Sequence, residues 1–164
     1  MSELLPERTL RVCRAASRLC AQRGWTAVPE VPLPNGRRMD LLALDNDGGF
    51  TAIEVKSCAR DFLTDSKWWE YRDWCDRLYF AVDLDFPQAL IPEDVGLIVA
   101  DEGEAAILRH PAEHKLAPAR RRSCCCAMRG WRPGGCRCWR TRRGRRKCAR
   151  RCGWNELTPP PRHA

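Results

Sequence analysis

The sequence predicts an α/β protein in which helices flank a mixed β-sheet, followed by a disordered basic tail. Apolar residues recur every three or four positions in two segments and alternate with polar residues in several shorter ones, as in helices that cover a sheet. The composition also changes abruptly near residue 120. Residues 1–118 hold 14 Lys/Arg and 20 Asp/Glu, a net charge of −6, whereas residues 119–164 hold 15 Lys/Arg and one acid. The total charge of +8 therefore belongs to the tail.

The first predicted element is an amphipathic helix over residues 7–23. Four arginines lie largely away from the apolar face of this helix. That face is formed by Leu10, Cys13, Ala16, Ser17 and Cys20. Gly24 stands where a glycine often ends a helix. A short strand over residues 25–28 should follow, ended by Pro29, and then a loop over residues 31–36.

The middle of the chain predicts a β-hairpin, a second helix and three more strands. Residues 39–44 and 50–55 form the hairpin, joined by a turn rich in Asp and Gly. Helical spacing returns over residues 61–78. Its apolar stripe consists of Trp68, Tyr71, Cys75 and Leu78. The remaining predicted strands are residues 79–82, 96–100 and 105–108.

The chain shows no sign of membrane insertion or secretion. No apolar run approaches the roughly 20 residues needed to cross a bilayer. Residues 1–14 are charged and lack the apolar stretch of a signal peptide. We therefore expect a cytoplasmic protein without membrane contact.

Three polar residues of the predicted hairpin carry the strongest chemical signal. Glu54 and Lys56 are two positions apart on one strand and so point to the same face, and Asp40 lies on the neighbouring strand. Two carboxylates can hold Mg²⁺, which prefers oxygen ligands, and a lysine can orient water or stabilise charge on a phosphate. This set suits metal-dependent hydrolysis of a phosphodiester. The alternative is an exposed strand face with an acid near a turn.

The same residues resemble the motif of the PD-(D/E)XK nucleases, with Met39 in the place of the proline. The resemblance implies a restriction-endonuclease-like fold and Mg²⁺ or Mn²⁺ as cofactor. It makes Asp40 and Glu54 metal ligands and Lys56 the catalytic lysine. Glu30 lies where many members place a further acidic ligand, and a solvated loop residue is an equal alternative.

A longer string of motifs resembles the MmcB-like family of bacterial DNA-repair proteins. The string includes Gly36-Arg-Arg-Met-Asp40, Glu54-Val-Lys-Ser57, Asp65-Ser-Lys-Trp68 and Tyr79-Phe-Ala-Val82. The likeness continues through residues 92–101 and 114–120, and it covers about residues 7–122. It implies a nuclease-like domain over residues 1–122, with DNA as a partner and other repair proteins as possible further partners.

Several residues near the motif are candidates for contacts with DNA. The cations that flank it and suit phosphate contacts are Arg37, Arg38, Arg60 and Lys67. A solvated charged surface is the alternative for them. Trp69 lies off the apolar stripe and is the best candidate for an exposed aromatic ring that stacks on a base. Asp61 and Asp65 share a helix face and either support the site or cap the helix.

Two other functions remain open. A relative of the nuclease fold can bind DNA or a repair partner without cutting, because fold and site do not prove turnover. Alternatively, the basic tail is the functional part and binds nucleic acid as an arm.

The tail, residues 123–164, differs from any folded domain in composition. From residue 119 onward there is no Ile, Val, Phe or Tyr, and Leu157 is the only Leu. Such a segment cannot bury enough apolar surface to offset the ordering of the chain. We interpret it as the product of a shifted reading frame, disordered and without a specific site. A zinc-binding tail is the rival, with the ligands Cys136, Cys138, Cys148 and Cys152, whose spacing is unlike that of common zinc modules.

The nucleotide sequence tests this interpretation. With G+C-rich codons, residues 123–131 read in the alternate phase as Leu-Leu-Leu-Arg-His-Ala-Arg-Leu, which is an amphipathic helix suited to covering a sheet. We expect the gene to encode such a helix in that frame. An early stop codon in the alternate frame after the codon of Arg122, or no amphipathic pattern there, would contradict the interpretation.

Overall fold

The computed structural model describes residues 5–101 and 103–129, and the described residues up to Met128 form one compact unit. Its centre is a six-stranded sheet in the order β1-β2-β3-β4-β5-β6. The parallel pairs are β3 with β4 and β4 with β5, and the other neighbours are antiparallel. The predicted mixed sheet flanked by helices is therefore confirmed.

The strands agree with the predicted ones to within a few residues. They are β1 (Thr26–Pro32), β2 (Arg38–Leu44), β3 (Phe50–Lys56), β4 (Arg77–Asp83), β5 (Gly96–Asp101) and β6 (Glu104–Arg109). The helices are α1 (Leu5–Gln22), α2 (Ala59–Thr64) and α3 (Pro118–Arg129), with two 3₁₀ helices, η1 (Trp68–Trp74) and η2 (Gln88–Leu90). None of the described helices is long and apolar enough to cross a membrane.

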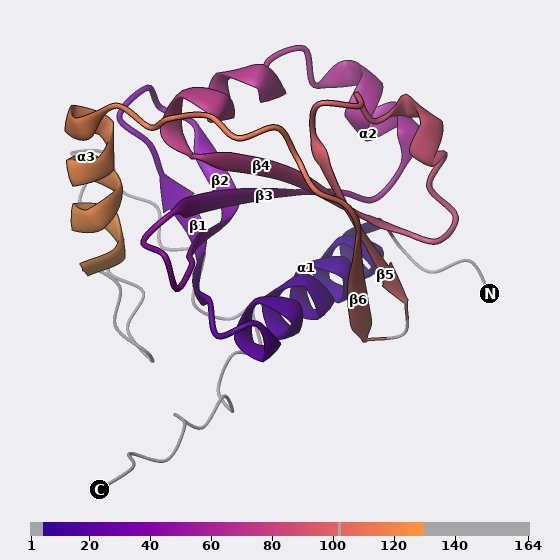
Figure 1. Ribbon diagram of the computed structural model, residues 1–164. Coiled ribbons are helices and arrows are strands. Elements are labelled where there is room, and N and C mark those ends of the chain that lie inside the picture. The colour runs from indigo at the N-terminus through magenta and orange to yellow at the C-terminus, as the bar shows by residue number, and fades with distance from the viewer. Residues whose placement is uncertain (1–4, 102, 130–164) are drawn as a thin grey trace, which may run out of the picture. The chain divides into compact units, whose positions relative to one another are not determined.

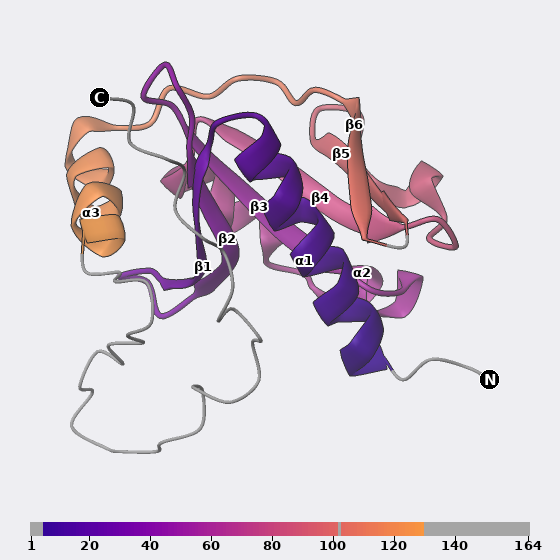
Figure 2. The same ribbon diagram turned by 90° about the horizontal axis from the view of Figure 1, so that it is seen from below.

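The two faces of the sheet carry separate apolar cores, because side chains alternate along each strand. One core packs beneath α1, which crosses the sheet (Figures 1 and 2). The other includes residues of α2, η1 and α3 on the opposite face. β3 is buried at every position and so contributes to both cores. A polar side chain on β3 is therefore cut off from water and depends on neighbouring protein groups, which Glu54 and Lys56 find but the hydroxyl of Thr51 does not.

α1 ends as its sequence predicts. Gly24 adopts a φ of 74°, a left-handed conformation that glycine reaches without steric cost. The backbone N–H groups of Gly24 and Trp25 donate to carbonyls of Ala21 and Cys20 in the last helical turn. The chain is thereby turned directly into β1.

Two predicted elements are wrong in detail. The helix expected over residues 61–78 is divided into α2 and η1, and Leu78 lies in β4. The division falls at Asp65, whose side chain accepts a hydrogen bond from the N–H of Lys67 and so stabilises a turn. The first strand also continues through Pro29, which an edge strand tolerates because one side of its backbone needs no partner.

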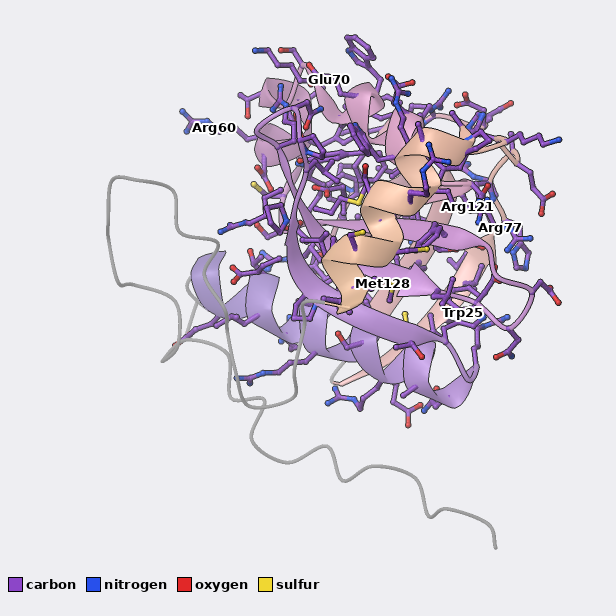
Figure 3. All side chains as sticks on the ribbon, turned by 90° about the vertical axis from the view of Figure 1, so that its left-hand side faces the viewer. Trp25, Arg60, Glu70, Arg77, Arg121 and Met128 are labelled. Atoms are coloured by element: carbon purple, nitrogen blue, oxygen red, sulfur yellow. The ribbon has the colours of Figure 1, made fainter. Side chains whose placement is uncertain are left out.

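The expected boundary between domain and tail, at residue 122, falls inside α3. This helix is attached by Arg121, which donates to both carboxylate oxygens of Asp76 and to the carbonyl of Gly48. Cys124 is buried in the apolar core, and its thiol donates to the carbonyl of Trp74. Figure 3 shows α3 with Arg121 near Arg77 at one end and Met128 at the other. The helix thus includes residues 123–129, and the predictions for residues 130–164 lie outside the described residues.

Candidate active site

The structure places Asp40, Glu54 and Lys56 together at one end of β2 and β3. Leu41 pairs with Ile53, so the next opposed positions along the antiparallel register are Asp40 and Glu54. The alternation along β3 directs Glu54 and Lys56 to the same face as Ala52, which belongs to the core beneath α2 and η1. The elements that follow Lys56 in the chain therefore pack over these side chains.

The two carboxylates take the place of backbone partners where the β2–β3 pairing ends. Glu54 Oε1 accepts a hydrogen bond from the backbone N–H of Asp40 at 3.2 Å. In return, Asp40 Oδ2 accepts one from the backbone N–H of Val55 at 2.9 Å. Each side chain is thus held by the backbone of the other strand. The arrangement keeps both carboxyl groups side by side and limits their rotation.

Burial strongly affects the protonation of this pair. Glu54 is 4% exposed, and burial raises its pKa to about 9, with the charge of Asp40 as the second cause. Burial also raises the pKa of Asp40, although the N–H of Val55 and the charge of Lys56 oppose this effect. Two adjacent carboxyl groups do not readily ionise together in a low dielectric. Without a cation, the pair should retain a proton at neutral pH.

Lys56 is buried beside the pair and has a carboxylate partner. Its Nζ donates to Asp65 Oδ2 at 2.6 Å, and the two side chains are 8% and 20% exposed. Burial acts to raise the pKa of Asp65, but the hydrogen bond and charge of Lys56 outweigh it and lower this pKa. Asp65 therefore serves as a negatively charged anchor for the lysine. The sequence placed Asp65 near the site without identifying this role.

Tyr71 of η1 closes the site from the α2–η1 side, and sequence reasoning had treated it as a core residue. Its hydroxyl donates to the carbonyl of Arg38 at 3.1 Å. Burial raises the pKa of Tyr71, and the charges of Glu54 and Asp40 raise it further. The phenol is therefore a neutral hydrogen-bond donor close to both carboxyl groups. The packing of η1 on β3 brings it there, and although Tyr71-Arg-Asp73 belongs to the string that resembles the MmcB-like family, the motif did not indicate this position.

Glu30 lies opposite Asp40 in the register of β1 and β2. Its carboxylate pairs with Arg38 at 3.5 Å. Glu30 has a φ of 52°, which is uncommon for a residue other than glycine. Such conformations cluster at functional sites but cost free energy wherever they occur. The role of Glu30 as a metal ligand therefore stays a prediction.

The four cations expected to contact DNA divide into two groups. Arg37 forms an ion pair with Glu70 at 3.0 Å, and Arg38 pairs with Glu30. The exposed side chains of Arg60 and Lys67 have no carboxylate partner among the ion pairs of the described residues. Of these four cations, Arg60 and Lys67 are therefore the ones most available to an external anion.

The donor set fits a hard cation that keeps part of its hydration shell. Among the described residues, no three His, Cys, Asp or Glu side chains are grouped so as to hold a metal ion. Asp40 and Glu54 thus supply two carboxylates. Mg²⁺ commonly binds through one or two carboxylates and retains several waters, whereas a structural zinc ion requires four protein ligands. The pair suits Mg²⁺ or Mn²⁺ better than zinc.

A separate open hollow lies at the other end of β3. Its lining includes Gly48, Asp76, Arg77, Glu113 and Arg121. The arginines there are already paired: Arg77 with Glu113 and Asp45, and Arg121 with Asp76. The hollow therefore coincides with an ionic network that fastens the C-terminal segment to the sheet. It contains none of the residues predicted to be catalytic.

Comparison with known proteins agrees with this architecture. A family model described as "DNA repair protein MmcB-like" matches residues 1–130. Among solved structures, a protein of unknown function from Silicibacter pomeroyi is 37% identical, with a TM-score of 0.69. That match covers 79% of this chain and 87% of the other. A search of curated proteins gives no match.

The raised pKa of Glu54 predicts an unusual dependence of stability on pH. Folding raises this pKa from 4.5 to about 9, so the folded state binds the proton more tightly than the unfolded state. Stability from this group is therefore present at low pH and is lost as the pH rises from about 4.5 towards 9. In EDTA at pH 8, we expect Glu54→Gln to be more stable than the wild type by about 2 kcal/mol or more.

Urea unfolding in EDTA at pH 5.5 and pH 8 measures this difference. Glu93→Gln, which changes an exposed acid in the loop before β5, serves as the control and should follow the wild type. Equal changes in stability with pH for wild type and Glu54→Gln would contradict the assigned environment of Glu54.

Proposed function

Because this chain belongs to the MmcB-like DNA repair protein family, we propose that it is a Mg²⁺- or Mn²⁺-dependent nuclease that hydrolyses DNA phosphodiester bonds. The observation that carries the proposal is the reciprocal pair of carboxyl groups, Asp40 and Glu54, with the buried cation of Lys56 beside it. The resemblance to the PD-(D/E)XK motif supports the same three residues.

The proposed chemistry assigns each side chain one task. Asp40 and Glu54 hold the metal ion, and the hydrogen bonds from the opposite strand fix their orientation. When bound, the metal ion polarises the phosphoryl oxygen and lowers the pKa of a bound water. Lys56 places a positive charge where negative charge develops on the phosphate. Hydrolysis then joins the water oxygen to phosphorus and releases one sugar oxygen as an alcohol.

A fixed lysine is valuable because such electrostatic groups act best when they need no rearrangement during the reaction. The ion pair with Asp65 restrains Lys56 before substrate binds. Tyr71 donates to the carbonyl of Arg38 and so holds the strand that precedes Asp40. The protein therefore orients Lys56 and the two carboxyl groups before a cation or substrate binds.

A second function is favoured by one observation. Lys56 already has an anionic partner in Asp65, and among the described residues no three His, Cys, Asp or Glu side chains are grouped so as to hold a metal ion, so the same fold can hold DNA or a repair partner without cutting. The two functions are distinguished by whether bound DNA is cleaved when Mg²⁺ is added.

The first prediction of the nuclease proposal concerns metal binding. Asp40→Asn should abolish Mn²⁺ binding measured by titration calorimetry while leaving the circular dichroism spectrum unchanged, because the variant removes half of the charge that attracts the ion. Asp47→Asn, an exposed acid in the β2–β3 turn, should bind Mn²⁺ as the wild type does. Equal affinity in wild type and Asp40→Asn would show that the ion is not held here.

The second prediction of the nuclease proposal concerns catalysis. Lys56→Ala should bind Mn²⁺ nearly as well as the wild type but cleave DNA at least about 100-fold more slowly, since a preorganised charge contributes on this scale. Cleavage is measured with Mg²⁺ or Mn²⁺ on labelled single-stranded, duplex, branched and flapped DNA, and Lys115→Ala is the exposed-lysine control. If the wild type binds these DNAs and cuts none, the non-cutting function is the better one.

A further inference from the structure

Exposed apolar side chains gather near the end of the sheet that carries the candidate site. Among the described residues, the exposed large apolar side chains are Leu63, Trp69, Leu84 and Leu108. Leu63 and Trp69 belong to the crossover that joins the end of β3 to β4, and Leu84 directly follows β4. β3 and β4 are parallel, so their final residues, which include Lys56, meet at one edge. Three of the four exposed side chains therefore lie on segments that leave this edge.

Trp69 is fixed in place although 57% of it is exposed. Its indole N–H donates to the carbonyl of Ser66 at 3.2 Å. The residue before Ser66 is Asp65, which holds Lys56 through one carboxylate oxygen and the N–H of Lys67 through the other. A single short turn thus positions both the buried lysine and the exposed indole. An exposed aromatic ring that is restrained by the same turn as Lys56 suits stacking on a base.

The crossover carries the exposed cations Arg60 and Lys67 as well as the acids Asp61, Glu70 and Asp73. The neighbouring cations Arg37 and Arg72 are paired with Glu70 and Asp94. Arg60 and Lys67 are exposed and, within the described part of the chain, lack a carboxylate partner. Figure 3 shows Arg60 extending away from the body of the protein. We define Arg60, Leu63, Lys67 and Trp69 as the crossover surface.

We propose that the crossover surface binds an unpaired stretch of DNA, with Trp69 stacked on a base and with Arg60 and Lys67 against phosphates. The inference rests on the proposed function, because the candidate site supplies the position of the phosphate to be cut. It names the substrate class as DNA with a single-stranded region. In a duplex each base face is covered by its neighbours, so the indole can stack only where a base is unpaired.

A protein partner fits this surface less well. The cores of protein–protein interfaces are depleted in Lys, and here Lys67 lies two positions before Trp69. Cations next to an aromatic ring are instead the usual composition of a surface that follows a single strand.

Fluorescence anisotropy in EDTA tests the inference with two probes, a labelled oligothymidylate and a labelled duplex. We expect Trp69→Ala to weaken binding of the single strand about 10-fold or more, on the scale of one lost stacking interaction, and to leave duplex binding unchanged. Trp69→Phe should recover most of the affinity because it keeps an aromatic face. Leu108→Ala, which removes an exposed apolar side chain on β6, is the matched control and should bind like the wild type.

The double variant Arg60→Gln/Lys67→Gln separates stacking from charge. Phosphates are common to both probes, so this variant should weaken both and lessen the salt dependence of binding. The inference is overturned if Trp69→Ala binds the single strand as tightly as the wild type, if it loses both probes equally, or if the wild type binds no single strand. EDTA prevents metal-dependent cleavage, so these experiments measure binding only. If Trp69 contributes to binding but the protein cuts no DNA when Mg²⁺ is present, the proposed hydrolysis is refuted and the present inference is not.

Discussion

The burial of β3 on both faces is the constraint on which the rest of the structure depends. An apolar strand in this position needs only packing, but this one carries Glu54 and Lys56 into the interior. Buried charges are costly unless partners are close. Glu54 is satisfied by the backbone N–H of Asp40 on the neighbouring strand β2, and Lys56 by the carboxylate of Asp65 in the following crossover. The contacts that build the candidate site therefore also satisfy Glu54 and Lys56 at the buried end of β3.

The electrostatic state of the site follows from the same burial. The pKa of Glu54 and that of Asp40 are both raised, mainly because water is excluded. A cation bound here would gain two oxygen ligands that are already oriented, but it would first have to displace the proton that the raised pKa values retain, so its affinity should increase with pH. The ammonium of Lys56 is already paired with the carboxylate of Asp65.

The two ends of β3 have different tasks. At its start, Asp76 accepts hydrogen bonds from the backbone of Phe50 and Leu116 and from Arg121, which joins strand, loop and α3. The arginines there pair with acids, and this ionic network attaches the C-terminal segment. At the other end, within the described part of the chain, the exposed side chains of Arg60 and Lys67 have no carboxylate partner among the ion pairs, and Trp69 is exposed.

By itself the sequence determined the mixed sheet, the hairpin and the association of Asp40 with Glu54 and Lys56, because strand alternation and a short turn are local properties. It did not determine that Tyr71 faces the carboxyl groups, that Asp65 holds Lys56, or that the expected long helix divides at that ion pair. These features depend on how the crossover packs over β3. The alternation pattern likewise could not show that Cys124 is buried beyond the composition change near residue 120. Contacts between segments distant in the chain decided these points, since burial and pairing depend on neighbours that local periodicity does not specify.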